Sequence, residues 1–393
     1  MHLKPTRIFL VYFPALLIDF AFSSVLTNSA FYSSYLSLSS TFLGILVAIV
    51  TAFYAFLAIP LGKLSDRIDR TLMLYAGCIL ISIVSIVIPL CYKKIHLLMI
   101  FPFLGISLAL FWPTYEAWLA EREGEGTLLH RVMLFNLFWS IGITMGPTVS
   151  GYLYQDDAPF RPFYLACVLG LLTLTVLLLS KSSQEQVDTE PQQSTQTLFP
   201  PPEVRRRYLN IARCANFASY FALAVLRWLA PKLTKEMGIP TVVFGNLMLT
   251  LGSFQTLTFL FLGTGYSTRW HYRLSPMVIT QVLAILSFVV LWRVQHMFIW
   301  FIAFVIIGIS VAFSYFGSLY YGLDQHTDKG NKSGWHEAVL GFGSLLGPLI
   351  CGIAADSEFG MQSPYLVCAV VILVAIFVEV IIASKIRSAT DVP

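Results

Sequence analysis

Charge is scarce in this chain. Asp, Glu, Lys and Arg make up only 12% of its 393 residues, whereas 57% of the residues are hydrophobic. Together with a mean hydropathy of +0.74, this excludes an ordinary soluble domain. The alternating pattern of membrane strands is also missing, which argues against a membrane barrel. The basic residues mostly flank the apolar runs. The net charge of +4 therefore reflects membrane topology and gives no reason to expect nucleic-acid binding.

Motifs that carry chemistry are missing as well. The six cysteines lack paired spacing, so we expect small buried side chains and neither a disulfide nor a metal site. In the segment "HEAVL", Leu340 stands where a zinc motif would need a second histidine. The sequence contains no phosphate-binding loop and no nucleophile–base set. It therefore predicts no cofactor, no ATP-driven step and no enzyme.

Long apolar runs make up most of the sequence. About 20 apolar residues are needed to cross a bilayer as a helix, and runs of this length recur along the whole chain. Lys4 and Arg7 precede the first run as in a signal peptide, but that run is too long to be one and should remain as a helix. The sequence predicts an all-α membrane protein with twelve transmembrane helices, over residues 8–28, 42–61, 72–92, 95–119, 130–154, 160–180, 208–230, 242–263, 274–293, 297–322, 334–355 and 363–384.

One polar segment divides these helices into two sets of six. Residues 181–207 are rich in Gln, Ser, Thr and Pro and end in three arginines, which is typical of a flexible linker held at a membrane surface. The segment separates a bundle in residues 1–180 from a second bundle in residues 208–393. Most Lys and Arg residues fall on the side of the linker and of both termini, so the positive-inside rule places that side in the cytoplasm. We expect a monomer surrounded by lipid.

The two sets of helices share a repeated motif. The segment "GITMGPTVSG" in the fifth predicted helix matches "GSLLGPLICG" in the eleventh, and "GIS" recurs in the fourth and tenth. Glycines four residues apart permit close helix packing, and a proline bends a helix. The motif therefore predicts equivalent packing sites in two related halves, at Gly142, Gly146, Pro147 and Gly151 and at Gly343, Gly347, Pro348 and Gly352.

The segment "GKLSDRIDR" between the second and third predicted helices resembles a loop signature of the major facilitator superfamily, G-x-L-x-D-R-x-G-R-[KR]. Asp69 and Thr71 depart from it, whereas five residues match: Gly62, Leu64, Asp66, Arg67 and Arg70. The resemblance covers the whole chain and implies this family's fold, with two pseudo-symmetric six-helix bundles. In the family, the Asp and Arg residues of this loop form a cytoplasmic latch that favours the outward-open state. Here Asp66 would face the start of the eleventh helix.

Other segments bear on the direction of transport. The fifth helix resembles the family's antiporter signature, with Ser150 replacing one glycine, and this implies export. Phe101 stands where the fourth helix often carries a buried arginine, so coupling through that arginine is not expected. The strings "FWPTYEAWLAE" and "WHEAVLGFG" resemble a little-studied bacterial branch of the superfamily. The resemblance implies a secondary transporter of the bacterial inner membrane that uses a small-molecule substrate and protons. Import of a small nutrient, which could be anionic, or sensing without transport remain alternatives.

Charged residues inside the predicted helices are candidates for function, because a charge in the bilayer is costly. Asp19 lies near the middle of the first helix, on one face with Ser23 and Thr27. Other charges are expected close enough to a helix end for their side chains to reach water: Glu116, Arg213, Glu337 and Glu379 at the cytoplasmic ends and Arg227 at the outer end. In the family, the first and seventh helices line a central cavity. The resemblance therefore places Asp19, Ser23 and Thr27 opposite Arg213, Asn216, Tyr220 and Arg227, unless Asp19 and an arginine form a purely structural ion pair.

The repeat relates Glu337 to Asn136, because each precedes its motif by the same distance. Both are expected to face the cavity near its cytoplasmic end. Glu337 is a candidate for proton coupling together with Asp19, and His336 adds a group that titrates near neutral pH. The alternative is that Glu337 and His336 only favour the start of their helix, where an acidic side chain complements the helix dipole.

Aromatic residues make up 15% of the chain. Several lie in the cytoplasmic halves of helices that border the cavity in the family: Trp112, Tyr115, Trp139, Tyr315 and Tyr320. Trp112 shares a helix face with Glu116. Aromatic walls with few polar groups suit a small amphipathic solute and could hold a cation. The alternative is an aromatic belt at the membrane interface.

Overall fold

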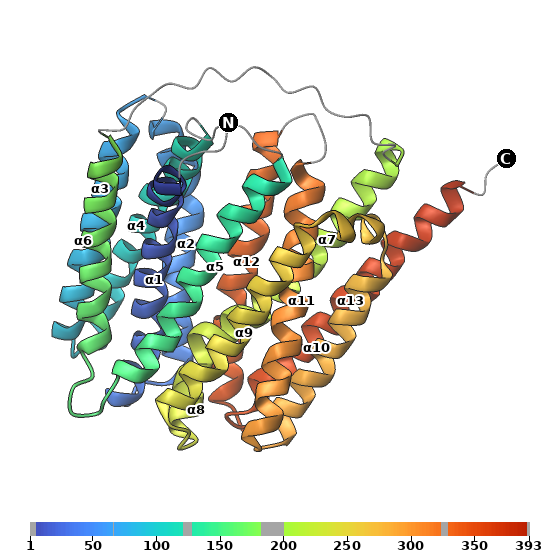
Figure 1. Ribbon diagram of the computed structural model, residues 1–393. Coiled ribbons are helices and arrows are strands. Elements are labelled where there is room, and N and C mark those ends of the chain that lie inside the picture. The colour runs from blue at the N-terminus through green and yellow to red at the C-terminus, as the bar shows by residue number, and fades with distance from the viewer. Residues whose placement is uncertain (1–4, 66, 121–127, 182–199, 324–328, 391–393) are drawn as a thin grey trace.

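The computed structural model describes residues 5–65, 67–120, 128–181, 200–323 and 329–390 (Figure 1). Every regular element in these ranges is a helix. The first half contains α1 (Pro5–Tyr35), α2 (Ser40–Ser65), α3 (Arg70–Val87), α4 (Lys94–Ala120), α5 (Leu128–Leu153) and α6 (Arg161–Lys181). The second half contains α7 (Pro202–Ala224), α8 (Ala230–Glu236), α9 (Thr241–Leu262), α10 (Ser275–Arg293), α11 (Met297–Leu323), α12 (Lys329–Ala355) and α13 (Ser363–Thr390). Short turns stand at Ile88–Leu90, Val225–Leu229 and Gly265–Trp270.

These helices coincide with the twelve predicted spans, because α7, the π-helical turn Val225–Leu229 and α8 form one continuous span. Within the described ranges, eleven spans are long and apolar enough to cross a membrane. The remaining long helix, α5, falls short because polar and small side chains interrupt it, among them the buried Asn136, Ser140, Thr144 and Thr148. The prediction of an all-α membrane fold is confirmed, and the chain is an integral membrane protein.

The seventh span is longer than predicted at both ends. It begins at Pro202, so the last six residues of the predicted linker are helical. Proline fits the first helical position because its missing N–H needs no partner there, and Glu203 complements the dipole. At its other end the span continues to Glu236, because the π-helical turn accommodates Pro231 without ending the helix. Arg227 therefore lies inside the span, and its expected position near the outer end is wrong.

The repeated glycines occupy equivalent packing positions in the two halves. A Cβ atom on Gly142 of α5 would collide with the backbone carbonyl of Leu16 on α1, and one on Gly343 of α12 would meet that of Phe217 on α7. Two further members of the motif pack across the halves: Gly151 against Thr241 at the start of α9, and Gly352 against Ser40 at the start of α2. Pro147 and Pro348 lie inside α5 and α12. The motif therefore packs each helix against its own half and against the other half.

Bonds between the halves gather at the end opposite the termini. We call the end where α1 begins and α13 ends the termini side, and the opposite end the far side (Figure 1). On the far side, Asp356 accepts hydrogen bonds from the backbone N–H groups of Ser40 (3.0 Å) and Thr41 (2.6 Å) at the start of α2. Lys235 of α8 donates to Asp156 and to the Tyr154 hydroxyl, each at 2.7 Å.

The far-side carboxylates are ionised at neutral pH. Burial raises the pKa of Asp356, but the hydrogen bonds from Thr41 and Ser40 outweigh it, and the net pKa lies below the ordinary value. The hydrogen bond from Lys235 likewise lowers the pKa of Asp156. A lowered pKa means that each contact stabilises this arrangement at any pH above the ordinary value of about 4 and is lost only as the pH falls through the lowered pKa. These contacts are therefore constant across physiological pH.

Replacing Asp356 with Asn should weaken the far-side contact, because the negative charge at the start of α2 is lost. We expect conformations separated on the far side to become more populated. Spin labels introduced as Tyr92→Cys and Phe359→Cys, which are exposed on the two halves, would report this as longer electron–electron distances. Glu358→Gln removes a charge from the same exposed loop and is the control. Identical distance distributions in the Asp356 variant and the control would contradict the prediction.

The loop between α2 and α3 is described on both sides of Asp66, but Asp66 itself lies outside the described residues, as does its predicted contact with the eleventh helix. Asp69 and Thr71, which depart from the loop signature, have a local role. The Asp69 carboxylate accepts from the backbone N–H of Thr71 at 2.9 Å and caps α3. Arg67 is exposed, whereas Gly62 and Arg70 are half-buried.

Candidate functional site

A cavity lies between the two halves. The first half contributes Asp19, Phe22, Val50, Thr51, Tyr54, Leu108, Trp112, Glu116, Phe135, Trp139 and Ile143 to its lining, and the second half contributes Tyr220, Leu223, Ala224, Arg227, Trp228, Tyr315, Glu337, Leu340, Gly341 and Ser344. Asp19 lies at mid-length of α1, whereas Glu116 and Glu337 lie near the ends of their helices on the termini side. The lining therefore extends from the middle of the bundle toward the termini side.

Asp19 is a buried carboxylate in the lining of this cavity. The side chain is only 3% exposed, and its Oδ2 atom has no hydrogen-bond partner among the described residues. Ser23, one turn along α1, donates to the backbone carbonyl of Asp19 at 2.5 Å and not to its carboxylate. A buried carboxylate normally has a partner, since leaving one without a partner costs several kcal/mol or changes its protonation. Asp19 is thus available to a proton or to a ligand.

Arg227 is the cationic member of the lining. The π-helical turn carries it, and the side chain is buried. Its guanidinium donates to the Gln255 side chain on α9 at 3.0 Å, which fixes its direction. Asp19 and Arg227 attract each other across the cavity, but within the described chain no ion pair joins them. The structural alternative of a closed ion pair between Asp19 and this arginine is therefore not realised in this conformation.

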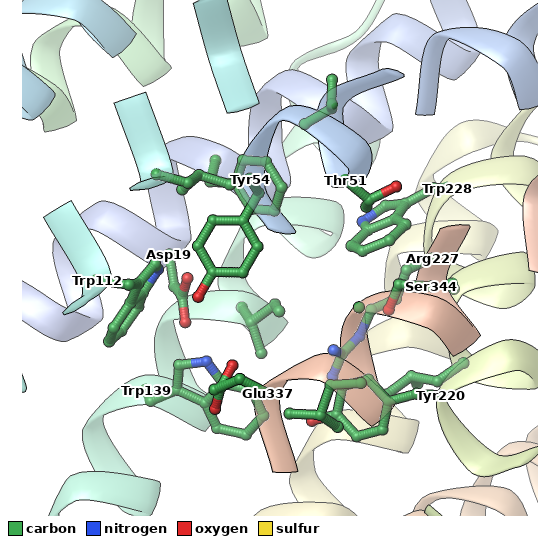
Figure 2. Close-up of a pocket in the computed structure, with 18 of the residues that line it drawn as sticks. Asp19, Thr51, Tyr54, Trp112, Trp139, Tyr220, Arg227, Trp228, Glu337 and Ser344 are labelled. Atoms are coloured by element: carbon green, nitrogen blue, oxygen red, sulfur yellow. The ribbon is translucent and has the colours of Figure 1, made fainter. Parts of the chain in front are cut away.

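Two further carboxylates, Glu116 of α4 and Glu337 of α12, line the cavity on its termini side. When ionised, Glu116 and Glu337 repel each other, and Glu337 also repels Asp19. Figure 2 shows Asp19 beside Tyr54 and Trp112, and Glu337 beside Trp139, whereas Arg227 lies toward Ser344 and Tyr220. The three carboxylates and the guanidinium thus line one cavity, and the charge of Arg227 acts on Asp19 more strongly than that of Glu337 does.

Aromatic contacts support these positions. Trp139 of α5 stacks on Tyr315 of α11 across the halves, with ring centroids 5.4 Å apart and an interplanar angle of 13°. Tyr315 stacks in turn on Tyr220, at 5.8 Å. Trp112 packs edge-on against Phe135, at 6.1 Å. Offset and edge-on pairs of this kind stabilise ring orientation, so the walls of the cavity are preformed.

Several residues predicted for the cavity lie outside the described lining. The Tyr115 hydroxyl donates to the backbone carbonyl of Val11 at 2.6 Å, and Tyr320 stacks on Phe316. His336 is buried, and its Nδ1 atom lies 2.9 Å from the Ser318 hydroxyl. The other predicted residues outside the lining are Ser23, Thr27, Asn136, Arg213 and Asn216. Neighbouring positions on one helix thus have different surroundings, as the pair His336 and Glu337 illustrates.

Asn136 and Asn216 are unusual among these residues. Both are fully buried, and neither amide has a hydrogen-bond partner among the described residues. The repeat places Asn136 at the position equivalent to Glu337, yet only Glu337 belongs to the lining. The repeat therefore predicts the helix and its depth but not the local rotation of each side chain.

Some lining residues were not predicted from the sequence, notably Tyr54, Trp228 and Ser344. Arg227 and Trp228 are neighbours that both line the cavity, and both lie in the π-helical turn. The signal available in the sequence was Pro231, four residues after Arg227, where it would disturb a regular helix. Tyr54 lies on α2, a span without charged residues in its apolar part, so nothing in its pattern marked a polar face.

Glu379 differs from its predicted position near water. It is fully buried on α13 and accepts a hydrogen bond from Gln281 of α10 at 2.8 Å. The expectation that its side chain reaches the membrane surface is therefore wrong. Within the second half, packing of α7, α10 and α13 encloses it, and a glutamine partner on another helix could not be inferred from the spacing on α13. Glu379 is outside the cavity lining.

Two halves of membrane-spanning helices around a cavity with ionisable and aromatic walls define a polytopic helical membrane protein with a central binding site. The model of the Major Facilitator Superfamily (MFS) matches residues 8–331, and the chain belongs to this family. The resemblance found in the loop and repeat motifs is thereby confirmed. The family consists of transporters, not enzymes.

Relatives and solved structures agree with this assignment. The chain is 32% identical over 130 residues to an uncharacterised MFS-type transporter of Methanocaldococcus jannaschii, a match that covers 32% of each protein. It is 28% identical over 134 residues to one of Mycobacterium tuberculosis, covering 34% of this chain and 31% of that protein. The matches thus span about a third of these relatives.

Two solved structures are similar over nearly the whole chain. A bacterial homologue of the human lysosomal transporter Spinster, in an inward-facing and occupied conformation, has a TM-score of 0.73 at 14% identity and 98% coverage of both chains. The nucleoside transporter NupG has a TM-score of 0.71 at 13% identity, covering 96% of this chain and 99% of that chain. At these identities the likeness shows the fold alone.

Proposed function

We propose that the protein is a secondary active transporter that works by alternating access and exports a small amphipathic organic solute in exchange for protons. The observation that carries this proposal is Asp19, a buried carboxylate with an unpartnered oxygen in a cavity between two pseudo-symmetric halves. A charged group at mid-membrane depth costs free energy, so an ionisable residue there usually has a function. Proton exchange at such a group can couple a gradient to solute movement.

The arrangement of contacts supports alternating access. Bonds between the halves close the far side, whereas the lining extends toward the termini side. We place the termini side in the cytoplasm of a bacterial inner membrane, and the distribution of Lys and Arg supports this orientation. In that orientation the conformation is inward-facing. The cavity lies at the interface of the two halves, where rocking of one half against the other would expose it alternately to the two sides.

The three carboxylates provide sites for protons. Glu337 shares the cavity lining with titratable or charged groups from several elements: Asp19 of α1, Tyr54 of α2, Glu116 of α4, Tyr220 of α7, Arg227 of the π-helical turn and Tyr315 of α11. Because Glu116 and Glu337 repel each other when both are ionised, protonation of one is coupled to the other. His336, in contrast, is not part of the lining, although its ring packs on Tyr315, and we propose no role for it in proton transfer.

Transport and sensing can be distinguished with purified protein. A thermal-stability screen of organic solutes would first identify compounds that bind. Each would then be tested for counterflow in proteoliposomes, where an excess of unlabelled compound inside drives uptake of a labelled trace. Counterflow above protein-free liposomes would support a transporter. Compounds that bind tightly but never show counterflow would contradict the proposal and favour a sensor with the same fold.

Replacing Glu337 with Gln should flatten the dependence of transport on pH between about 5.5 and 8, because one of the cavity carboxylates can no longer exchange a proton. Protein yield should stay similar, since a purely helix-end role accounts for only about 0.3–1 kcal/mol. The matched control is His336→Gln, its neighbour outside the lining, which should keep the wild-type profile. A wild-type profile in the Glu337 variant would reduce Glu337 to a structural residue.

A further inference from the structure

Carboxyl groups outnumber cationic groups in the cavity lining. Its lining contains three carboxylates, Asp19, Glu116 and Glu337, against one guanidinium, that of Arg227. Within the described lining no lysine or second arginine offsets them. Arg227 is in addition held by the Gln255 side chain, 3.0 Å away, so part of its hydrogen-bonding capacity is already used. The lining therefore offers a ligand three carboxyl groups and one guanidinium.

Asp19 is the carboxylate most in need of a partner. Its Oδ2 atom is buried and has no hydrogen-bond partner among the described residues, and Asp19 belongs to the cavity lining together with Tyr54 and Trp112 (Figure 2). A positive group placed there would satisfy this oxygen. A second positive contact is available at Glu337, whose repulsion with Glu116 a cation would relieve. The anion-binding alternative, at Arg227, would have to bring a negative ligand past these carboxylates.

The walls next to the carboxylates are aromatic. Trp112, Tyr54 and Trp139 line the same cavity as Asp19 and Glu337 (Figure 2). The face of an aromatic ring attracts a cation, and the attraction is largest for tryptophan and for sites removed from water. The rest of the lining is mostly apolar, with Phe22, Leu108, Ile143, Leu223 and Leu340. The cavity thus combines a site for a positive group with apolar walls for a hydrocarbon body.

We propose that the cavity binds a monovalent organic cation: its ammonium group lies between Asp19 and Glu337 against Trp112 and Trp139, and its apolar body packs on the remaining walls. This inference names the substrate class of the transporter proposed above. Only the statement that the cation is transported rests on that proposed function. Binding itself depends on the cavity alone. A neutral or anionic solute of the same shape should bind more weakly, because it leaves the Asp19 oxygen without a partner.

The test compares two ions that share a tail and differ in charge. Binding of 4-phenylbutyl-trimethylammonium and of 4-phenylbutane-1-sulfonate to the purified full chain would be measured by isothermal titration calorimetry in lipid nanodiscs. We expect the cation to bind at least about tenfold more tightly than the sulfonate. Asp19→Asn and Glu337→Gln should each weaken cation binding by about tenfold. Glu379→Gln makes the same chemical change at a buried carboxylate outside the lining and should leave binding unchanged.

The outcomes are distinguishable. Tighter binding of the sulfonate, lost in Arg227→Gln, would overturn the inference and favour an anionic substrate. Cation binding that neither carboxylate variant weakens, in proteins that still unfold cooperatively, would also overturn it, as would absence of cation binding to folded wild-type protein. A cation that binds as expected but shows no counterflow would leave this inference standing and contradict the proposed transport. Counterflow of an anion would support the proposed transport and contradict the inference of a cationic substrate.

Discussion

Asp19→Asn should abolish accumulation of solute driven by a pH gradient, while the protein stays folded in the membrane. Asparagine has nearly the same shape as aspartate but cannot exchange a proton. Because no described residue donates a hydrogen bond to Oδ2 of Asp19, the substitution breaks no bond there that supports the fold. The expected result is accumulation reduced to the level of protein-free liposomes, with a thermal unfolding midpoint close to that of the wild type.

Counterflow separates coupling from a general loss of function. The asparagine variant should still exchange solute when no gradient is imposed, provided that the solute concentration is raised to offset weaker binding. Glu379→Gln serves as the control, since it removes another buried carboxylate that does not line the cavity. Unchanged gradient-driven accumulation in the Asp19 variant would remove Asp19 from the coupling mechanism.

Gly347→Leu should prevent α12 from packing and strongly reduce the yield of folded protein. A Cβ atom at this position would collide with the backbone of Phe221 on α7, which cannot move as a flexible side chain could. Overpacking a core typically costs about 1–3 kcal/mol, and the full leucine side chain here meets the backbone of α7 where α7 and α12 approach closely. We expect aggregation or loss of the monodisperse peak in detergent gel filtration.

A matched pair of smaller substitutions tests the cause. Gly347→Ala introduces only the colliding Cβ atom, whereas Gly341→Ala, six residues earlier on α12, meets only the Ala55 Cβ atom at 3.9 Å, an ordinary contact. Since alanine favours a helix over glycine by about 1 kcal/mol, Gly341→Ala should be neutral or stabilising. Gly347→Ala should lower the unfolding midpoint. Equal behaviour of the two alanine variants would contradict a packing role for Gly347.

Features that repeat along the chain could be predicted from the sequence. Each span shows its own apolar run, and the two glycine–proline motifs are enough by themselves to indicate related halves. The packing of Gly142 on Leu16 and of Gly343 on Phe217 gives these motifs a common physical basis. The family assignment followed from the same features together with the loop signature, and the family match over residues 8–331 confirms it.

The site was only partly predictable, because side-chain direction depends on how each helix is rotated by its neighbours. Asp19, Glu116, Arg227 and Glu337 line the cavity together. His336, one residue from Glu337, bonds with Ser318 instead. Arg227 and Trp228 lie in a π-helical turn, which breaks the regular period on which a sequence argument relies. Burial of Glu379 by α10 likewise depends on a tertiary contact.

The most direct test of the account is movement of protons in response to solute. Proteoliposomes would contain a trapped pH-sensitive dye and a solute that stabilises the protein, and they would be diluted into buffer without solute. Efflux of the solute should acidify the interior with wild-type protein, because protons enter in exchange, and it should leave the pH unchanged with Asp19→Asn. Solute efflux without any change in internal pH in the wild type would contradict proton-coupled export through this cavity.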